Sequence, residues 1–97
     1  MDSTEAATLL EKYITQLKTV PYQELRQRVE EDRVESFETI GPSGVLYQIE
    51  VQAFWDDRAK RNIRLVAAID DGGLRAFCPL TRSFIKSPDG TFVGELG

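Results

Sequence analysis

The residue types that most often carry out catalysis are scarce in this chain. The sequence of 97 residues has no histidine and a single cysteine, Cys78. A nucleophilic cysteine or serine needs a neighbouring base, and histidine is the usual one. Alternation in the surrounding segment predicts that Cys78 points into the core, where a buried thiol behaves as a small hydrophobe. We therefore expect no catalytic residues and a protein that is not an enzyme.

Two pairs of adjacent aspartates are candidate metal or acid–base groups. They are Asp56-Asp57 and Asp70-Asp71, at opposite ends of one predicted strand pairing. The strand between them separates the pairs by about 20 Å, which is too far for a shared metal ion or a carboxylate dyad. The sequence Asp70-Asp71-Gly72-Gly73 is also typical of a hairpin turn. We expect neither a metal nor a cofactor.

A basic cluster is the stronger candidate for a ligand site. It comprises Arg58, Lys60, Arg61 and Arg64. We expect these residues in a loop between two strands, with Arg82 brought to the same edge by a later strand. One interpretation is an anion-binding site for a phosphate-like ligand. The other is a solvated loop that Asp56 and Asp57 partly neutralise.

Charge and composition limit the possible partners. The net charge is −4, and residues 1–44 carry five Lys or Arg against nine Asp or Glu. This balance does not suit a nucleic-acid binder, which needs clustered positive charge. It is compatible with a basic protein partner, and the alternative is that mild acidity only keeps the protein soluble. The longest apolar run has five residues, Leu65–Ile69, so we expect no membrane span. The acidic start, Met1–Glu5, lacks an export signal, and we expect a single cytoplasmic domain over 1–97.

The first thirty residues follow the 3.6-residue period of amphipathic helices. A helix is predicted over about 3–18, with its apolar stripe at Ala6, Leu10, Ile14 and Leu17. Pro21 suits the start of a second, shorter helix that runs to about Val29, because proline lacks the N–H that a first helical turn leaves unpaired. The acidic run 30–32 opposes the helix dipole at the C-terminal end, so we expect that end to fray.

From residue 34 onward the apolar residues alternate with period two, which is typical of half-buried strands. Strands are predicted over 34–40, 45–55, 63–69 and 74–80, with a short final pair joining 84–86 to 91–93. Glycine-containing turns separate several of them, at 41–44, 70–73 and 87–90. Pairing Trp55 with Ile63 sets apolar residues opposite apolar residues along both strands. In the first hairpin, a four-residue turn at 41–44 predicts Ile40 opposite Val45.

These elements predict an α+β fold. An N-terminal amphipathic helix plus a short second helix, within 1–30, packs on one face of an antiparallel meander of four to five strands within 34–95. The second face of the sheet mixes aromatic and polar residues, as an interaction surface or homodimer contact does. Its candidate contact residues are Phe37, Phe54, Val66 and Phe77. Leu46 and Ala68 share that face. The alternative is burial of this face under Phe84, Ile85 and Phe92.

Several short motifs are similar to those of a known group of proteins. They are Gly41–Gly44, Phe54–Asp57, Ile69–Gly73, Arg75–Phe77 and Pro88–Gly90, and the likeness covers about residues 34–95. In these motifs the chain resembles a group of short bacterial proteins of unknown function. The resemblance implies a bacterial cytosolic protein, and it brings no activity, ligand or catalytic residue with it.

Two classes of function are compatible with these features. The first is a non-catalytic protein-interaction module, such as a small inhibitor, an immunity-like protein or an adaptor, that uses the second sheet face or the acidic N-terminal half. The second is a small-molecule or anion-binding protein that uses the basic loop. We expect the first, and recovery of a protein partner from the source cell would separate the two.

Overall fold

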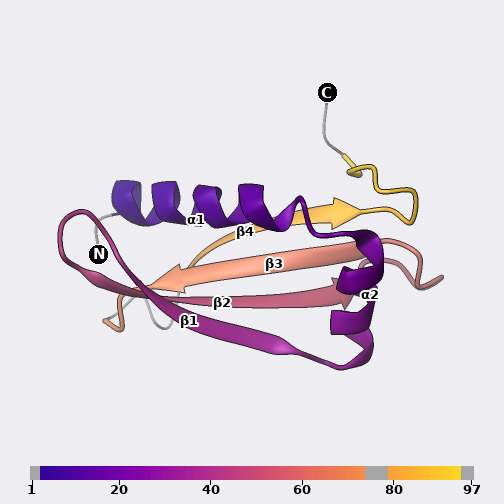
Figure 1. Ribbon diagram of the computed structural model, residues 1–97, viewed down its shortest axis with the longest axis horizontal. Helices are drawn as coiled ribbons and strands as arrows, with labels where there is room; N and C mark the ends of the chain where they lie inside the picture. The colour runs from indigo at the N-terminus through magenta and orange to yellow at the C-terminus, as the bar shows by residue number, and fades with distance from the viewer. Residues whose placement is uncertain (1–2, 74–78, 95–97) are drawn as a thin grey trace.

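The computed structural model describes residues 3–73 and 79–94 as two helices packed on a four-stranded sheet (Figure 1). The helices are α1 (Ser3–Leu17) and α2 (Tyr22–Glu30), and the strands are β1 (Val34–Ile40), β2 (Leu46–Trp55), β3 (Ile63–Asp70) and β4 (Leu80–Lys86). The sheet is antiparallel throughout, in the order β1-β2-β3-β4. The predicted α+β meander is therefore confirmed. Among the described residues, neither helix is long and apolar enough to cross a bilayer.

The core lies between the helices and one face of the sheet, which we call the inner face. Alternate residues of β2 and β3 point into it, and each is at most 4% exposed. They are Tyr47, Ile49, Val51, Ala53, Ile63, Leu65, Ala67 and Ile69. The α1 stripe supplies Ala6, Leu10 and Ile14, as predicted. One apolar stripe and one apolar sheet face thus bury each other.

The register of β2 and β3 is confirmed pair by pair, with Trp55 opposite Ile63 and Ile49 opposite Ile69. The predicted register of the first hairpin is wrong by one residue, since Ile40 lies opposite Leu46. The Gly41 N–H donates to the Val45 carbonyl at 2.9 Å, and Gly44 has a φ of 88°. This is a three-residue loop closed by a left-handed glycine, rather than the four-residue turn that the prediction assumed.

The predicted pairing of the fourth strand is also wrong. The alternation over 74–80 predicted Cys78 beside Leu65, but Leu65 lies opposite Phe84, because the partner of β3 is Leu80–Lys86. This register buries Phe84, which is 3% exposed and removes far more apolar surface from water than a cysteine does. Pro79 directly precedes the strand, where its missing N–H leaves no gap in the ladder. Cys78 and most of the predicted strand over 74–80 lie outside the described residues.

The end of α2 is capped where fraying was predicted. Asp32 adopts a left-handed conformation, with a φ of 52°. The Arg33 N–H donates to the Arg28 carbonyl at 3.0 Å, and the Asp32 N–H donates to the Val29 carbonyl at 3.1 Å. These two bonds form a Schellman motif, which satisfies carbonyls that a helix end otherwise leaves unpaired. At the other end, Pro21 occupies the N-cap, one residue before the helix begins.

Side-chain polar contacts fix α1 at both ends. The Glu5 carboxylate accepts hydrogen bonds from the Ser43 N–H (3.0 Å), the Ser43 hydroxyl (2.7 Å) and the Tyr47 hydroxyl (2.8 Å). The donors from Ser43 and then Tyr47 hold the pKa of Glu5 below its usual value. At the far end, the Lys86 ammonium donates to the carbonyls of Lys18 (3.0 Å) and Val20 (2.8 Å). These contacts connect the helix to the β1–β2 loop and to β4.

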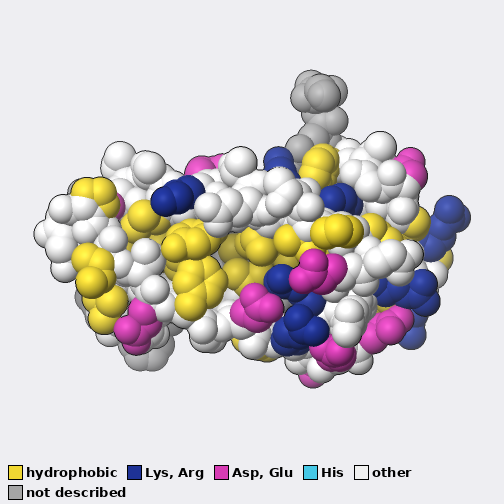
Figure 2. Space-filling model, viewed as in Figure 1, with side chains coloured by type: hydrophobic (Ala, Val, Ile, Leu, Met, Phe, Trp, Pro, Cys, Tyr) yellow, Lys and Arg dark blue, Asp and Glu magenta, His cyan; other side chains and the backbone are white. Residues whose placement is uncertain are grey.

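The helices cover the sheet unevenly. α1 packs on β3 and β4, whereas α2 packs on one end of β2 and β3 (Figure 1). β1 lies at the edge of the sheet, beyond both helices. In Figure 2 hydrophobic side chains reach the surface in the strip between α1 and β1. The helices therefore cover the inner face less completely near β1 than over β3 and β4.

Candidate protein-contact surface

The face of the sheet opposite the helices, which we call the outer face, is built by the strand register. Residues directly opposite one another in an antiparallel sheet point to the same side, so the even-numbered positions of β1, β2 and β3 share this face. The odd positions 81, 83 and 85 of β4 join them. Its apolar members are Val34, Ile40, Leu46, Phe54, Val66, Ala68 and Ile85.

The centre of the outer face is an apolar hollow. It has a volume of about 120 Å³, and its lining includes Val34, Phe54, Val66 and Ala68. Phe54 is 44% exposed and Val34 is 52% exposed, while Val66 and Ala68 are half-buried. Exposed aromatic and branched side chains around a hollow are typical of the anchor region of a protein interface.

Glu50 and Gln52 line this hollow, and Glu38 lies on the same face of the sheet. Glu38 and Glu50 are exposed, and neither forms an ion pair with another described residue. Among the described residues, the one arginine on this face is Arg64, which is already held by Asp56 at 3.0 Å and by the Ser83 hydroxyl at 3.3 Å. The described part of the outer face therefore presents carboxylates without ion pairs beside apolar surface.

The described residues among the four predicted contact residues lie on two different faces of the sheet. Phe54 and Val66 lie on the outer face, as expected. Phe37 lies on the inner face, where its ring meets that of Tyr13 edge-on at 4.9 Å. The one-residue shift in the first hairpin causes this change of face. Phe77 lies outside the described residues.

The same shift brings Val34 and Ile40 to the outer face, where the sequence analysis did not place them. The signal that could have identified them was the left-handed glycine of a three-residue loop at Gly44. Counting that loop correctly moves every β1 side chain to the other face.

The alternative cover for the outer face is not provided by Phe84 and Phe92. Phe84 points into the inner core, and its ring lies 5.6 Å from that of Phe92. Phe92 in turn lies beneath the ammonium groups of Lys18 and Lys86, at 5.2 and 5.3 Å. Both rings therefore belong to the helix side of the sheet, while Ile85 is itself part of the outer face. In the described residues nothing in the C-terminal segment lies over Phe54.

The basic loop between β2 and β3 gathers only part of its predicted set. Arg58, Lys60 and Arg61 are exposed on one turn, and Figure 2 shows Lys and Arg side chains gathered at this end of the molecule. The Asp57 carboxylate shapes the turn by accepting from the N–H groups of Arg61 (2.8 Å) and Asn62 (3.3 Å). Three neighbouring cations thus project from the end of the sheet.

The other two predicted members lie elsewhere. Arg64 points to the outer face and pairs with Asp56. Arg82 does not reach the loop: it lies in the middle of β4, opposite Ala67, and pairs with Glu11 of α1 at 2.9 Å. Lys86 occupies the strand end that was expected to carry Arg82.

The hollow next to this loop carries both signs of charge. It has a volume of about 390 Å³, and its lining includes Asp57, Arg61, Ser87 and Asp89. Hydrogen bonds from the Ser87 hydroxyl, and then from the Thr91 hydroxyl and N–H, lower the pKa of Asp89 from 3.8 to about 2. The carboxylate of Asp89 is therefore ionised at neutral pH and competes with any anion for Arg61.

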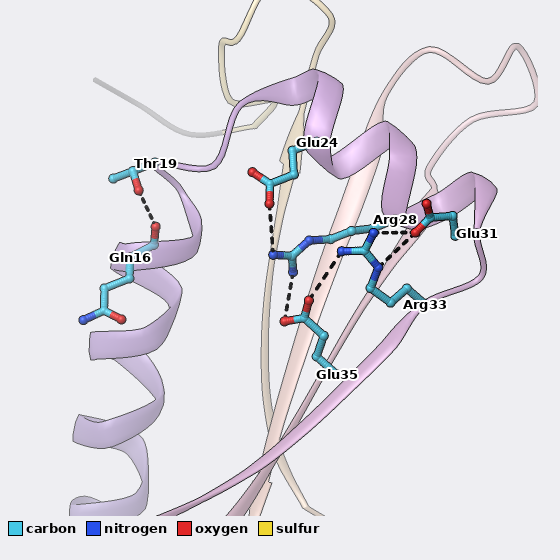
Figure 3. A network of polar contacts seen from close by, with 7 residues as sticks. All are labelled: Gln16, Thr19, Glu24, Arg28, Glu31, Arg33 and Glu35. Carbon is cyan, nitrogen blue, oxygen red and sulfur yellow. Dashed lines mark hydrogen bonds and ion pairs between the residues drawn. The ribbon is translucent and has the colours of Figure 1, made fainter.

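A further polar cluster, which the sequence analysis did not anticipate, connects α2 to β1 (Figure 3). The Arg28 side chain is only 10% exposed, and its guanidinium lies 3.8 Å from Glu24 and 3.5 Å from Glu35. Arg33 lies 3.8 Å from Glu35 and also binds Glu31. The hydrogen bonds between the Arg33 guanidinium and the Glu31 carboxylate lower the pKa of Glu31 and raise that of Arg33.

Nε and Nη1 of Arg28 have no hydrogen-bond partner within the described structure. Three carboxylates face two guanidinium groups in this cluster, so it offers no excess positive charge to an anion. Its contacts are those of a structural connection between the helix and the edge strand. Elsewhere in the described residues, no group of three or more Asp, Glu, Cys or His side chains is arranged to hold a metal ion.

Comparisons with protein-family models, with curated proteins and with solved structures found no match to this chain.

Proposed function

We propose that this chain is a non-catalytic protein-interaction module that binds a partner protein through the outer face of its sheet. The exposure of Phe54 carries the proposal. This ring is 44% exposed beside an apolar hollow, on the face that the helices leave open. An exposed apolar patch with a polar rim is what a protein contact requires, and it adds nothing to the stability of an isolated chain.

Charge defines the kind of partner. Glu50 lines the hollow and Glu38 lies on the same face, both without ion pairs in the described structure, and Arg64 is neutralised by Asp56. A partner surface with an apolar centre and Lys or Arg at its rim would pair with these carboxylates and would exclude acidic competitors. The net charge of −4 favours encounter with such a basic surface.

The test is capture of partners from the source cell with three forms of the chain. Phe54→Glu places a charge in the centre of the patch, whereas Gln16→Glu places the same charge on α1, on the opposite side of the sheet. We expect a protein that the wild type and Gln16→Glu retain and that Phe54→Glu loses, with unchanged circular dichroism. Glu50→Lys should weaken the same complex if the partner is basic. Equal recovery of the same proteins by all forms would contradict the proposal.

The second candidate function is anion binding at Arg58, Lys60 and Arg61. It is favoured by three exposed cations on one turn, and the nearby carboxylates of Asp57 and Asp89 oppose it. If the site binds anions, sulfate should raise the melting temperature more than chloride at equal ionic strength. Sulfate also stabilises proteins through exclusion from their surfaces, so the control is the double variant Arg58→Gln/Arg61→Gln. An equal sulfate effect in both proteins would leave a solvated loop.

A further inference from the structure

The outer edge of β1 is open in the described structure. β1 is the first strand of the sheet and pairs only with β2. The Gly41 N–H donates to Val45, so the alternation of an antiparallel ladder directs the main-chain groups of Phe37 and Thr39 towards β2. The N–H and carbonyl groups of Ser36 and Glu38 consequently face away from the sheet. No other described segment runs alongside them (Figure 1).

The other edge of the sheet is different, because the chain partly covers it. The Val93 N–H donates to the Ile85 carbonyl at 2.9 Å, and Phe92 forms a bridge with Lys86. An edge with free main-chain groups is a template for another strand, and proteins usually block it. Of the two edges, β1 is therefore the one with no partner strand along its whole length in the described structure.

The ends of β1 carry the most exposed large hydrophobic side chains of the described residues. Ile40 is 68% exposed and Val34 is 52% exposed. They lie at opposite ends of the strand, six positions apart, and both belong to the outer face. Two such positions meet when the strand is placed antiparallel to a copy of itself.

We propose that β1 pairs with β1 of a second copy of this chain, antiparallel and centred on Phe37, so that the two sheets join into one. This inference goes beyond the proposed function and uses the main-chain edge of β1, which shares only Val34 with the hollow around Phe54. The main-chain groups of Ser36 and Glu38 would complete the ladder, as in other cases of strand addition.

This register is complementary along its whole length. Val34 lies opposite Ile40 of the second copy, and Ser36 lies opposite its Glu38. On the inner side, half-buried Phe37 meets Phe37 of the second copy at the two-fold axis. Apolar pairs and a hydroxyl–carboxylate pair are favourable cross-strand neighbours, and no two carboxylates are directly opposed.

Other registers lose this complementarity. Pairing residue 36 with residue 40 of the second copy, instead of residue 38, sets Glu38 opposite Glu38. Pairing residue 36 with residue 36 instead sets Val34 opposite Glu38. Like charges directly opposed destabilise a strand pair, and so does a carboxylate facing an apolar side chain. The register centred on Phe37 is also the one that pairs all seven residues of β1.

The first test removes one free N–H. Ser36→Pro deletes a donor on the open edge without touching a bond to β2, and an edge strand tolerates proline. Ser36→Ala keeps the N–H and serves as the matched control. In sedimentation-velocity runs over a range of micromolar concentrations, we expect a dimer for the wild type and Ser36→Ala. We expect dissociation constants at least about tenfold higher for Ser36→Pro, since the dimer loses one bond per copy.

The second test fixes the register and does not depend on how proline affects folding. In a Cys78→Ser background, Phe37→Cys brings two thiols together at the two-fold axis, within the Cα spacing of a disulfide. Thr39→Cys lies on the same face, but in this register the two copies of residue 39 are about 13 Å apart. Mild oxidation should therefore cross-link Phe37→Cys rapidly and leave Thr39→Cys uncoupled.

A wild type that stays monomeric at all of these concentrations would overturn the inference, as would equal cross-linking of the two cysteine variants. Phe54→Glu provides the separation from the proposed function. Phe54 lies on β2, away from the open edge, so this variant should lose the partner protein and keep the dimer. A chain that dimerises but captures no partner would support the edge pairing alone.

Discussion

The buried ammonium of Lys86 caps the C-terminal end of α1. The residue is 7% exposed, and its Nζ donates to the carbonyls of Lys18 at 3.0 Å and Val20 at 2.8 Å. A positive charge at this position also complements the negative end of the α1 dipole. Lys86→Met keeps the apolar stem in place and removes only the charged donor, so it isolates the contribution of the cap.

The expected loss follows from these two bonds. A hydrogen bond from a charged donor contributes roughly 1.5–3 kcal/mol, and part of that gain offsets the cost of burying the ammonium. We therefore expect Lys86→Met to lower the free energy of unfolding by about 2–4 kcal/mol. For a domain of this size, each kcal/mol corresponds to roughly 4–8 °C in melting temperature.

The matched control is Arg82→Met, four residues earlier on the same strand and face. Arg82 pairs with Glu11, but both side chains are about half exposed, at 43% and 56%. Such surface pairs contribute roughly 0–1 kcal/mol. Urea denaturation followed by circular dichroism measures both variants. A loss for Lys86→Met no larger than that for Arg82→Met would refute the capping role of Lys86.

Two further substitutions test other local features. Asp32→Gly should raise the free energy of unfolding by up to about 1 kcal/mol, because the left-handed conformation at a φ of 52° strains any residue except glycine. Urea titration measures this gain, and a decrease would contradict the Schellman assignment. Asp89→Asn should destabilise the protein most at neutral pH. The lowered pKa of Asp89, about 2, means that its stabilising effect is present above about pH 4 and is lost as the pH falls towards 2. Melting curves at several pH values measure this convergence, and a difference that grows in acid would contradict it.

Much of the sheet could be predicted because β2 and β3 alternate without interruption. Trp55 and Ile63 fix a register in which every inner pair is apolar, and any one-residue slip would expose that whole face. The α1 stripe is as regular, and its buried residues were identified from spacing alone. The strong hydrophobic periodicity of α1 and of the β2–β3 pair therefore made this half of the fold predictable.

The prediction of the strand register failed where the register depends on the length of a turn. The loop after Ile40 contains three residues instead of four, so Phe37 moved to the inner face and Ile40 to the outer face. Alternation in β1 is weak, with serine, threonine and two glutamates among seven residues, and it did not reveal the slip. The outer-face positions on β2 and β3 were thus predicted correctly, but those on β1 required the structure.

The pairing of β4 was missed for a related reason. Apolar residues alternate in 74–80, whereas 80–86 has Arg82 and Lys86 on the same face as Leu80 and Phe84, so the local pattern favours 74–80. The choice depends on long-range contacts: Phe84 against Leu65, and Lys86 against the end of α1. Neither contact has a signature in the sequence near β4.

The most direct measurement of the central claim is site-specific photo-cross-linking in the source cell. A photoreactive phenylalanine analogue replaces Phe54 on the outer face in one form and Gln16 on α1 in the other. We expect a discrete adduct with another protein from position 54 and none of that adduct from position 16. An adduct of about twice the 11.0 kDa chain mass would identify a second copy as the partner on this face. No adduct from position 54, or the same adduct from both positions, would contradict binding through the outer face.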